Sequence, residues 1–121
     1  MLLITTNRSK KLLLVSFVGD VRPAEIAVSR PEITSEMAGL KPGFYYLVDF
    51  TNLLSMSVEC APEMGLTMEL LGRAGVGMVV RVIPDPSKDI GLNILTVFHY
   101  PHQLPVVTCQ NLAEALNALG L

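Results

Sequence analysis

The 121-residue sequence has little of three things: cysteine, an excess of charge of one sign, and long apolar runs. Its two cysteines do not make a disulfide framework, so we expect free thiols in a cytoplasmic protein. The 9 basic and 11 acidic residues leave a net charge of −2, which does not indicate a nucleic-acid groove. No apolar run approaches the ~18 residues of a membrane-spanning helix. Residues 1–5 lack the charged start and the cleavage site of a signal peptide.

What the sequence does have is apolar residues, which make up 50% of the chain at a mean hydropathy of +0.48. A chain of this length is one domain by size and can bury a core without disulfides or metals. The hydropathy is high for a small domain, so we expect a partner or a second copy of the chain to cover part of the apolar surface. We prefer a homodimer; the alternative is a monomer with an unusually apolar core.

The rest of the chain is organised around a strand, a polar loop and a helix. The apolar strand reads Phe44–Phe50, the hydroxyl-rich loop covers residues 51–60, and the helix begins near Ala61–Pro62 and runs to Arg73. Open α/β sheets usually place their functional loops at the C-terminal edge of the strands. The strand ends in an aspartate, which together with the loop predicts a small polar site at that edge.

Strands and helices alternate along the remaining sequence. A hairpin is predicted from the apolar runs Leu2–Thr6 and Leu12–Val18, and Asp20 can cap the helix that follows. Pro31 should kink or split that helix. Further strands are expected over Val76–Ile83 and Leu104–Thr108, with helices after Asp85–Pro86 and over Gln110–Leu119. This order predicts a single α/β domain with a mixed, mostly parallel sheet of about five strands packed with four helices.

Two parts of the central stretch and the end of the chain resemble a known family. Val48–Thr51 and Met56–Cys60 are similar to the two halves of a core motif that reads Asp-Leu-Ser and then Met-Asp-Ser-Ser-Gly. Val106–Cys109 followed by Leu112–Leu116 is similar to the same family's last strand and helix. With the element order, these segments make nearly the whole chain resemble a STAS domain, the fold of bacterial anti-sigma factor antagonists. The resemblance implies a non-enzymatic regulatory module whose partner is a kinase-type anti-sigma factor or a related switch protein.

The sequence departs from the family at its regulatory position. The phosphorylated serine of the family falls at Val58, which has no hydroxyl, and the preceding aspartate falls at Ser57. A phosphoryl switch here therefore cannot use the family's position. Ser57 is a better substitute than Ser55, because phosphate is well placed at a helix N-terminus. We favour the simpler hypothesis that the Ser57 hydroxyl caps the helix, and a third alternative gives it neither role.

We expect the loop and the start of the following helix to bind the protein partner. The predicted partner-binding or regulatory residues are Asp49, Thr51, Asn52, Ser55, Met56, Ser57, Glu59 and Cys60. Structural roles compete with this hypothesis: Asp49 can accept loop N–H groups, Glu59 can pair with the helix dipole, and Cys60 can be a structural thiol rather than a nucleophile of lowered pKa. The loop can be a partner surface only if Met56 and Ser57 lie outside the core.

A rival hypothesis is a small-molecule binder or small enzyme at the same sheet edge. Asp49, Ser57, Glu59 and Cys60 would then surround a concave pocket. The chain carries none of the short nucleotide-binding, hydrolase or metalloprotease motifs, and two histidines alone do not make a metal site. We therefore predict no catalytic residue, metal or cofactor. A purely structural homo-oligomer is the third hypothesis.

Overall fold

A five-stranded sheet forms the centre of the computed structural model, which describes residues 1–85, 95–96 and 99–121. The strands are Leu2–Asn7 (β1), Leu12–Phe17 (β2), Tyr45–Asp49 (β4), Met78–Val82 (β6) and Val106–Cys109 (β7). Their order in the sheet is β1-β2-β4-β6-β7. β1 runs antiparallel to β2, and all other neighbours are parallel. The predicted hairpin and the mixed, mostly parallel sheet are both confirmed.

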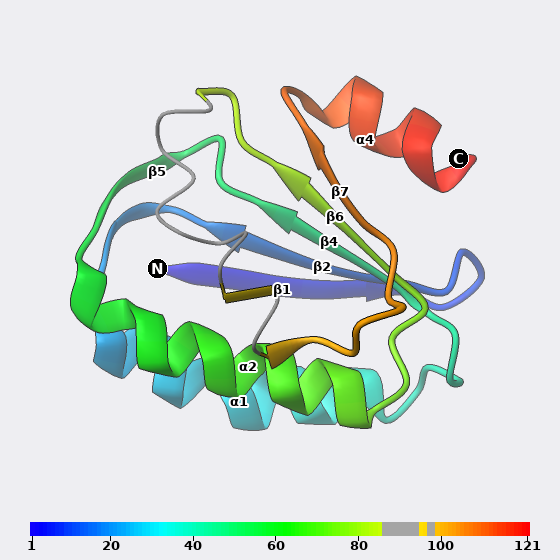
Figure 1. Cartoon of the computed structure of the whole chain (residues 1–121), viewed down its shortest axis with the longest axis horizontal. Helices are drawn as coiled ribbons and strands as arrows, with labels where there is room; N and C mark the ends of the chain where they lie inside the picture. The colour runs from blue at the N-terminus through cyan, green and yellow to red at the C-terminus, as the bar shows by residue number, and fades with distance from the viewer. Residues whose placement is uncertain (86–94, 97–98) are drawn as a thin grey trace.

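Helices cover both faces of this sheet (Figure 1). Helices α1 (Pro23–Met37) and α2 (Ala61–Arg73) lie on one face, and α4 (Leu112–Leu119) lies on the other. The described ranges thus hold three α-helices rather than the four predicted. Most of the helix expected after Asp85–Pro86 falls outside the described residues, and its described residues 95–96 and 99 are helical. No helix in the described ranges is long and apolar enough to cross a membrane.

The sheet separates two apolar cores because successive residues of a strand point to opposite faces. On β4, Tyr46 and Val48 join the core under α1 and α2, while Leu47 joins the core under α4. Val79 and Val80 divide in the same way on β6. Burying each such side chain contributes roughly 1.5–3 kcal/mol. A strand that is covered on both faces needs apolar residues at nearly every position, which explains the nearly continuous apolar runs of β4 and β6.

Two short strands that the sequence did not predict form a second sheet. Gly19–Val21 (β3) and Leu53–Met56 (β5) pair in parallel, so residues 51–60 are not a loop throughout. The Ser55 hydroxyl also donates a hydrogen bond to Asp20 Oδ1 at 2.6 Å. A four-residue strand shows too little alternation to be recognised, and its partner lies far away in the sequence.

The start and the middle of α1 differ from the prediction. Asp20 lies in β3 and does not cap the helix; Arg22 occupies the N-cap position without a side-chain cap hydrogen bond. Pro23 begins the helix, as predicted, because its missing N–H is not needed there. Pro31 lies inside α1, yet the helix runs without interruption from Pro23 to Met37. Packing of its buried face against the sheet is therefore sufficient to hold the helix together across the proline.

Candidate functional site

Asp49 ends β4 at the C-terminal edge of the parallel strands, where the sequence predicts a site. Its Oδ1 accepts hydrogen bonds from the Thr51 backbone N–H at 2.9 Å and from the Thr51 hydroxyl at 2.5 Å. These are the loop contacts expected of a structural carboxylate. Asp49 therefore fixes the turn through the exposed Thr51 and Asn52 into β5.

The chain between β5 and α2 exposes apolar side chains to solvent. Leu54 is 74% exposed and Val58 is 82% exposed. Met56 is half-buried and Ser57 is exposed, so neither lies in the core. This meets the condition for a partner surface. We define the β5–η1 surface as Leu54, Met56, Ser57, Val58 and Glu59.

A short 3₁₀ turn, η1 (Val58–Cys60), separates this surface from helix α2. Ser57 precedes η1 and makes no side-chain cap hydrogen bond, so the predicted capping role is wrong. The physical reason is that α2 begins only at Ala61, with Cys60 at its N-cap position. The 3₁₀ turn therefore separates Ser57 from the first residue of α2. Glu59 is exposed within η1.

Cys60 is a core residue with 1% of its surface exposed. Its Sγ lies 3.6 Å from the carbonyl oxygen of Val21, to which it donates a hydrogen bond. Burial raises the pKa of the Cys60 thiol, which is opposite to the lowered pKa that a nucleophile needs. Cys60 is thus a structural thiol and not part of the exposed surface. Within the described residues, no group of three or more His, Cys, Asp or Glu side chains could hold a metal ion.

The four polar residues of the small-molecule hypothesis do not converge. A cavity of about 60 Å³ lies beneath the β5–η1 segment, and its lining includes Ser57 and Cys60. Neither Asp49 nor Glu59 belongs to that lining. The remaining lining side chains, among them Met56 and Val58, are apolar. The described residues therefore do not form the polar pocket that this hypothesis required.

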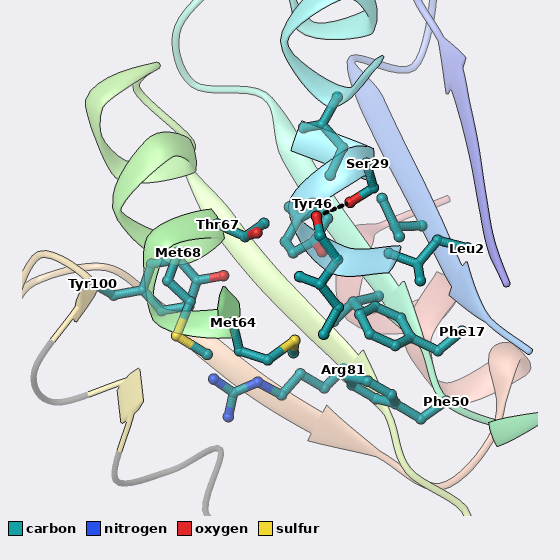
Figure 2. Close-up of a pocket in the computed structure, with 14 residues that line it drawn as sticks. Leu2, Phe17, Ser29, Tyr46, Phe50, Met64, Thr67, Met68, Arg81 and Tyr100 are labelled. Atoms are coloured by element: carbon teal, nitrogen blue, oxygen red, sulfur yellow. Dashed lines mark hydrogen bonds between the residues drawn. The ribbon is translucent and has the colours of Figure 1, made fainter. Parts of the chain in front are cut away.

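A second cavity, which sequence reasoning missed, lies between the sheet and helices α1 and α2 (Figure 2). Its lining is mostly apolar, but it also holds Tyr46 from β4, Arg81 from β6 and Tyr100. Arg81 is 1% exposed. The one available signal was this arginine within the valine-rich Val76–Ile83 segment, because arginine is rarely buried without a specific role. Nothing in the sequence indicated that the two tyrosines lie beside it.

Comparison with known proteins identifies the fold. No protein-family model and no curated protein matches the chain. One match is the solved structure of a DUF3478-family protein from Shewanella loihica, which is described as having a SpoIIAA-like fold. The TM-score is 0.70 at 18% sequence identity, and the match covers 98% of this chain and 92% of that chain. The chain has the SpoIIAA-like fold.

Two further SpoIIAA-like structures support this assignment. The anti-sigma factor antagonist SpoIIAA in its unphosphorylated form matches with a TM-score of 0.62 at 15% identity, over 99% of this chain and 98% of that one. An anti-sigma factor antagonist from Mycobacterium paratuberculosis matches with a TM-score of 0.55 at 18% identity, over 100% of this chain and 94% of that one. The resemblance to a divergent STAS-like domain is therefore confirmed at the level of the fold.

Proposed function

We propose that this chain is a non-enzymatic regulatory module that binds a protein partner through the β5–η1 surface. The observation that carries the proposal is the exposure of Leu54 and Val58, at 74% and 82%, on one short segment. Apolar side chains that become desolvated in a complex supply much of the binding free energy at a protein interface. The half-buried Met56 lies between them in the sequence and adds an adaptable side chain.

The partner we propose is an anti-sigma factor or a related kinase-like switch protein. Support comes from the fold, which the chain shares with two anti-sigma factor antagonists. Valine at position 58 cannot receive a phosphoryl group, so no negative charge can be added there. We therefore propose a partner contact that is not switched at this position. Phosphorylation of the exposed Ser57 stays a prediction, as do a homodimer and a cytoplasmic location.

A charge-insertion experiment tests this surface. Wild-type protein and the variants Leu54→Asp and Val58→Asp are tagged and purified from the native host, and the co-purified proteins are quantified by mass spectrometry. Leu112→Asp is the matched control, because Leu112 is 45% exposed and lies on α4, across the sheet. We expect wild type and Leu112→Asp to co-purify with a stoichiometric partner protein. Val58→Asp should recover at least about tenfold less of that protein, because a charge buried in an interface without a countercharge is costly.

Equal recovery of the partner with all variants would contradict the β5–η1 surface as the contact. Absence of any stoichiometric protein with wild type would contradict the regulatory proposal itself. Thermal unfolding of each variant shows whether a loss of binding reflects a loss of folding. The same mass spectra cover the peptide that contains Ser57 and decide whether that residue carries phosphate.

A further inference from the structure

We propose that this chain forms a two-fold dimer in which α4 of each copy packs on the part of the other copy's sheet that its own α4 leaves open. We define this open half as the side chains of β1, β2 and β4 that point to the α4 side of the sheet at its β1 edge: Leu3, Thr5, Leu12, Leu14 and Tyr45. None of them belongs to the β5–η1 surface. The inference does not rest on the proposed function, and either can fail without the other.

Strand geometry places the side chains of the open half on one face. On β2, Leu13 joins the core under α1 and α2, so its neighbours Leu12 and Leu14 point to the α4 side. On β1, Thr5 is paired with Leu14, and Leu3 lies two residues away, so both share that face. The open half is therefore a continuous patch of mainly apolar, uncharged side chains.

Helix α4 covers a different part of the same face. It packs on β6 and β7 and reaches β4 at its edge. Figure 1 shows it next to β7, at the opposite edge of the sheet from β1. Leu3 is accordingly 52% exposed, and Leu12, Leu14 and Tyr45 are only half-buried. Contiguous apolar patches that the described elements leave exposed in this way mark interaction sites.

The same helix has more apolar surface than its own sheet buries. Its sequence is LAEALNAL, so six of its eight residues are leucine or alanine. The buried residues of α4 are Ala115 and Leu119, whereas Leu112 is 45% exposed and Leu121, just beyond the helix, is 42% exposed. A surface helix usually carries polar residues around the rest of its circumference. An α4 that is apolar beyond its buried face indicates a second contact.

A second copy of the chain is the occupant because one chain carries both halves of the contact. A two-fold rotation about an axis parallel to the strands places the β7 side of one sheet over the β1 side of the other. Each α4 then lies on the open half of the other copy, and the two helices share one layer between the sheets. Rotation about an axis across the strands would stack α4 on α4 and leave both open halves exposed.

The charges at one end of the open half agree with this orientation. Lys10 and Lys11 lie in the turn between β1 and β2, next to the open half. Figure 1 shows α4 running back toward the end of the sheet where this turn lies. An axis parallel to the strands keeps that end of both copies together. The C-terminal end of the second copy's α4, which is the negative end of its dipole, then approaches the two lysines.

The size of the contact limits its strength. A helix of eight residues is about 12 Å long, so even when symmetry doubles the contact, the buried area falls at the low end of specific interfaces. We therefore expect a reversible dimer with a Kd of about 10–100 μM rather than an obligate one.

Analytical ultracentrifugation of the whole protein from about 1 μM to about 1 mM tests the dimer. Leu3→Asp changes the open half, and Leu112→Asp changes α4. Leu66→Asp is the matched control, because Leu66 is 48% exposed but lies on α2, which covers the other face of the sheet. Thermal unfolding shows whether each variant is folded. The NMR methyl signals of wild type at increasing concentration give a second readout that needs no variant.

We expect wild type to dimerise, and Leu3→Asp and Leu112→Asp each to raise the dimer Kd at least about tenfold, because a buried charge without a countercharge is costly. Leu66→Asp should leave the Kd within about threefold of wild type. The methyl signals of Leu3 and Leu112 should shift as the concentration rises, while those of Leu66 stay in place.

A wild type that remains monomeric at about 1 mM overturns the proposal. A dimer that only Leu3→Asp weakens also overturns it, because that result indicates pairing through the exposed edge of β1. Equal weakening by Leu66→Asp does the same, because it indicates non-specific association. Leu112→Asp separates this inference from the proposed function: it should lose the dimer and still recover the protein that binds the β5–η1 surface.

Discussion

Gly77 precedes β6 at a point where two backbone segments touch. A Cβ atom at this position would lie 2.7 Å from the carbonyl oxygen of Gly43. Gly43 itself has a φ of 92°, which side-chain-bearing residues rarely adopt. The Gly43 N–H donates to the Gly75 carbonyl and the Gly77 N–H donates to the Phe44 carbonyl, both at 2.7 Å. The turns that lead into β4 and β6 are thus held together by backbone contacts that leave no room for a side chain at position 77.

Gly77→Ala should destabilise the fold by about 2 kcal/mol, because backbone cannot move aside as a side chain can. Gly39→Ala is the matched control. Its Cβ would meet the guanidinium end of Arg8, an exposed and flexible side chain, so we expect a change within about 0.5 kcal/mol. Urea unfolding curves of both variants measure the difference. Equal stability of the two variants would show that the Gly43 backbone shifts to accommodate the new Cβ atom at little cost in free energy.

The two cysteines should be chemically silent in the folded protein. Cys60 is 1% exposed and Cys109 is 7% exposed, and burial raises the pKa of both thiols. Because the thiolate is the reactive form, neither should react with an aromatic disulfide reagent at about pH 8. Both should react once the chain is unfolded in guanidinium. Rapid reaction of Cys60 in the native protein would restore the hypothesis that this residue is a nucleophile of lowered pKa.

At the scale of elements, α4 is fixed at both ends by local interactions. The Asn111 side chain accepts a hydrogen bond from the Glu114 N–H at 2.9 Å. The Glu114 carboxylate in turn accepts one from the Gln110 N–H at 2.9 Å. Gly120 ends the helix with a φ of 74°. This reciprocal cap and the glycine together define a short helix that covers the second core.

Asn111→Ala should destabilise the protein by about 1 kcal/mol, because it leaves the Glu114 N–H without its acceptor. Asn117→Ala provides the control, since Asn117 is exposed inside the same helix. Alanine has the better helix propensity there, so no loss is expected. Thermal or urea unfolding distinguishes the two variants. An equal effect of both would mean that the cap contributes nothing beyond propensity.

Elements were predictable from the sequence where their signals are local. The predicted bounds of α2 match the observed Ala61–Arg73, because a proline marks its first turn and glycines follow its end. The β3–β5 pair was missed because its strands are short and lie far apart in the sequence. The prediction that Ser57 caps α2 was wrong because a 3₁₀ turn lies between Ser57 and that helix. The apolar pattern correctly predicted the order of the long strands and of the helices in the described ranges. The two errors, at β3–β5 and at Ser57, arose from features that the apolar pattern does not report.

At the scale of the whole molecule, what the sequence did not predict is the meeting of distant residues in the core. Tyr46, Arg81 and Tyr100 come from three separate segments and line one cavity. Each is unremarkable in its own segment: Tyr46 fits an apolar strand, and Tyr100 precedes a proline. Only the parallel pairing of β4 with β6, and the packing of residues 99–101 near α2, bring the three together. The meeting of these three side chains is therefore a property of the tertiary structure.

The buried acids of the two cores also make stability depend on pH in the alkaline range. Burial raises the pKa of Cys60 and Cys109 above the usual 9.0, and that of Tyr46 and Tyr100 above the usual 10.0. All four are therefore neutral in the folded chain at pH values where the unfolded chain releases their protons. The unfolded state then binds fewer protons than the folded state, so the free energy of unfolding falls as pH rises. Below about pH 8 these groups contribute no pH dependence.

We expect the free energy of unfolding to fall between about pH 8 and pH 11. Each of the four groups lowers it by up to roughly 1.4 kcal/mol per pH unit once the pH exceeds the pKa that the group has in the unfolded chain. The double variant Tyr46→Phe/Tyr100→Phe removes both phenols and should flatten the curve above about pH 10. Below that pH it should run parallel to wild type, because the thiols remain. Urea unfolding at a series of pH values measures both curves. If the two stay parallel up to about pH 11, the phenols ionise equally in both states and are reached by water in the folded protein.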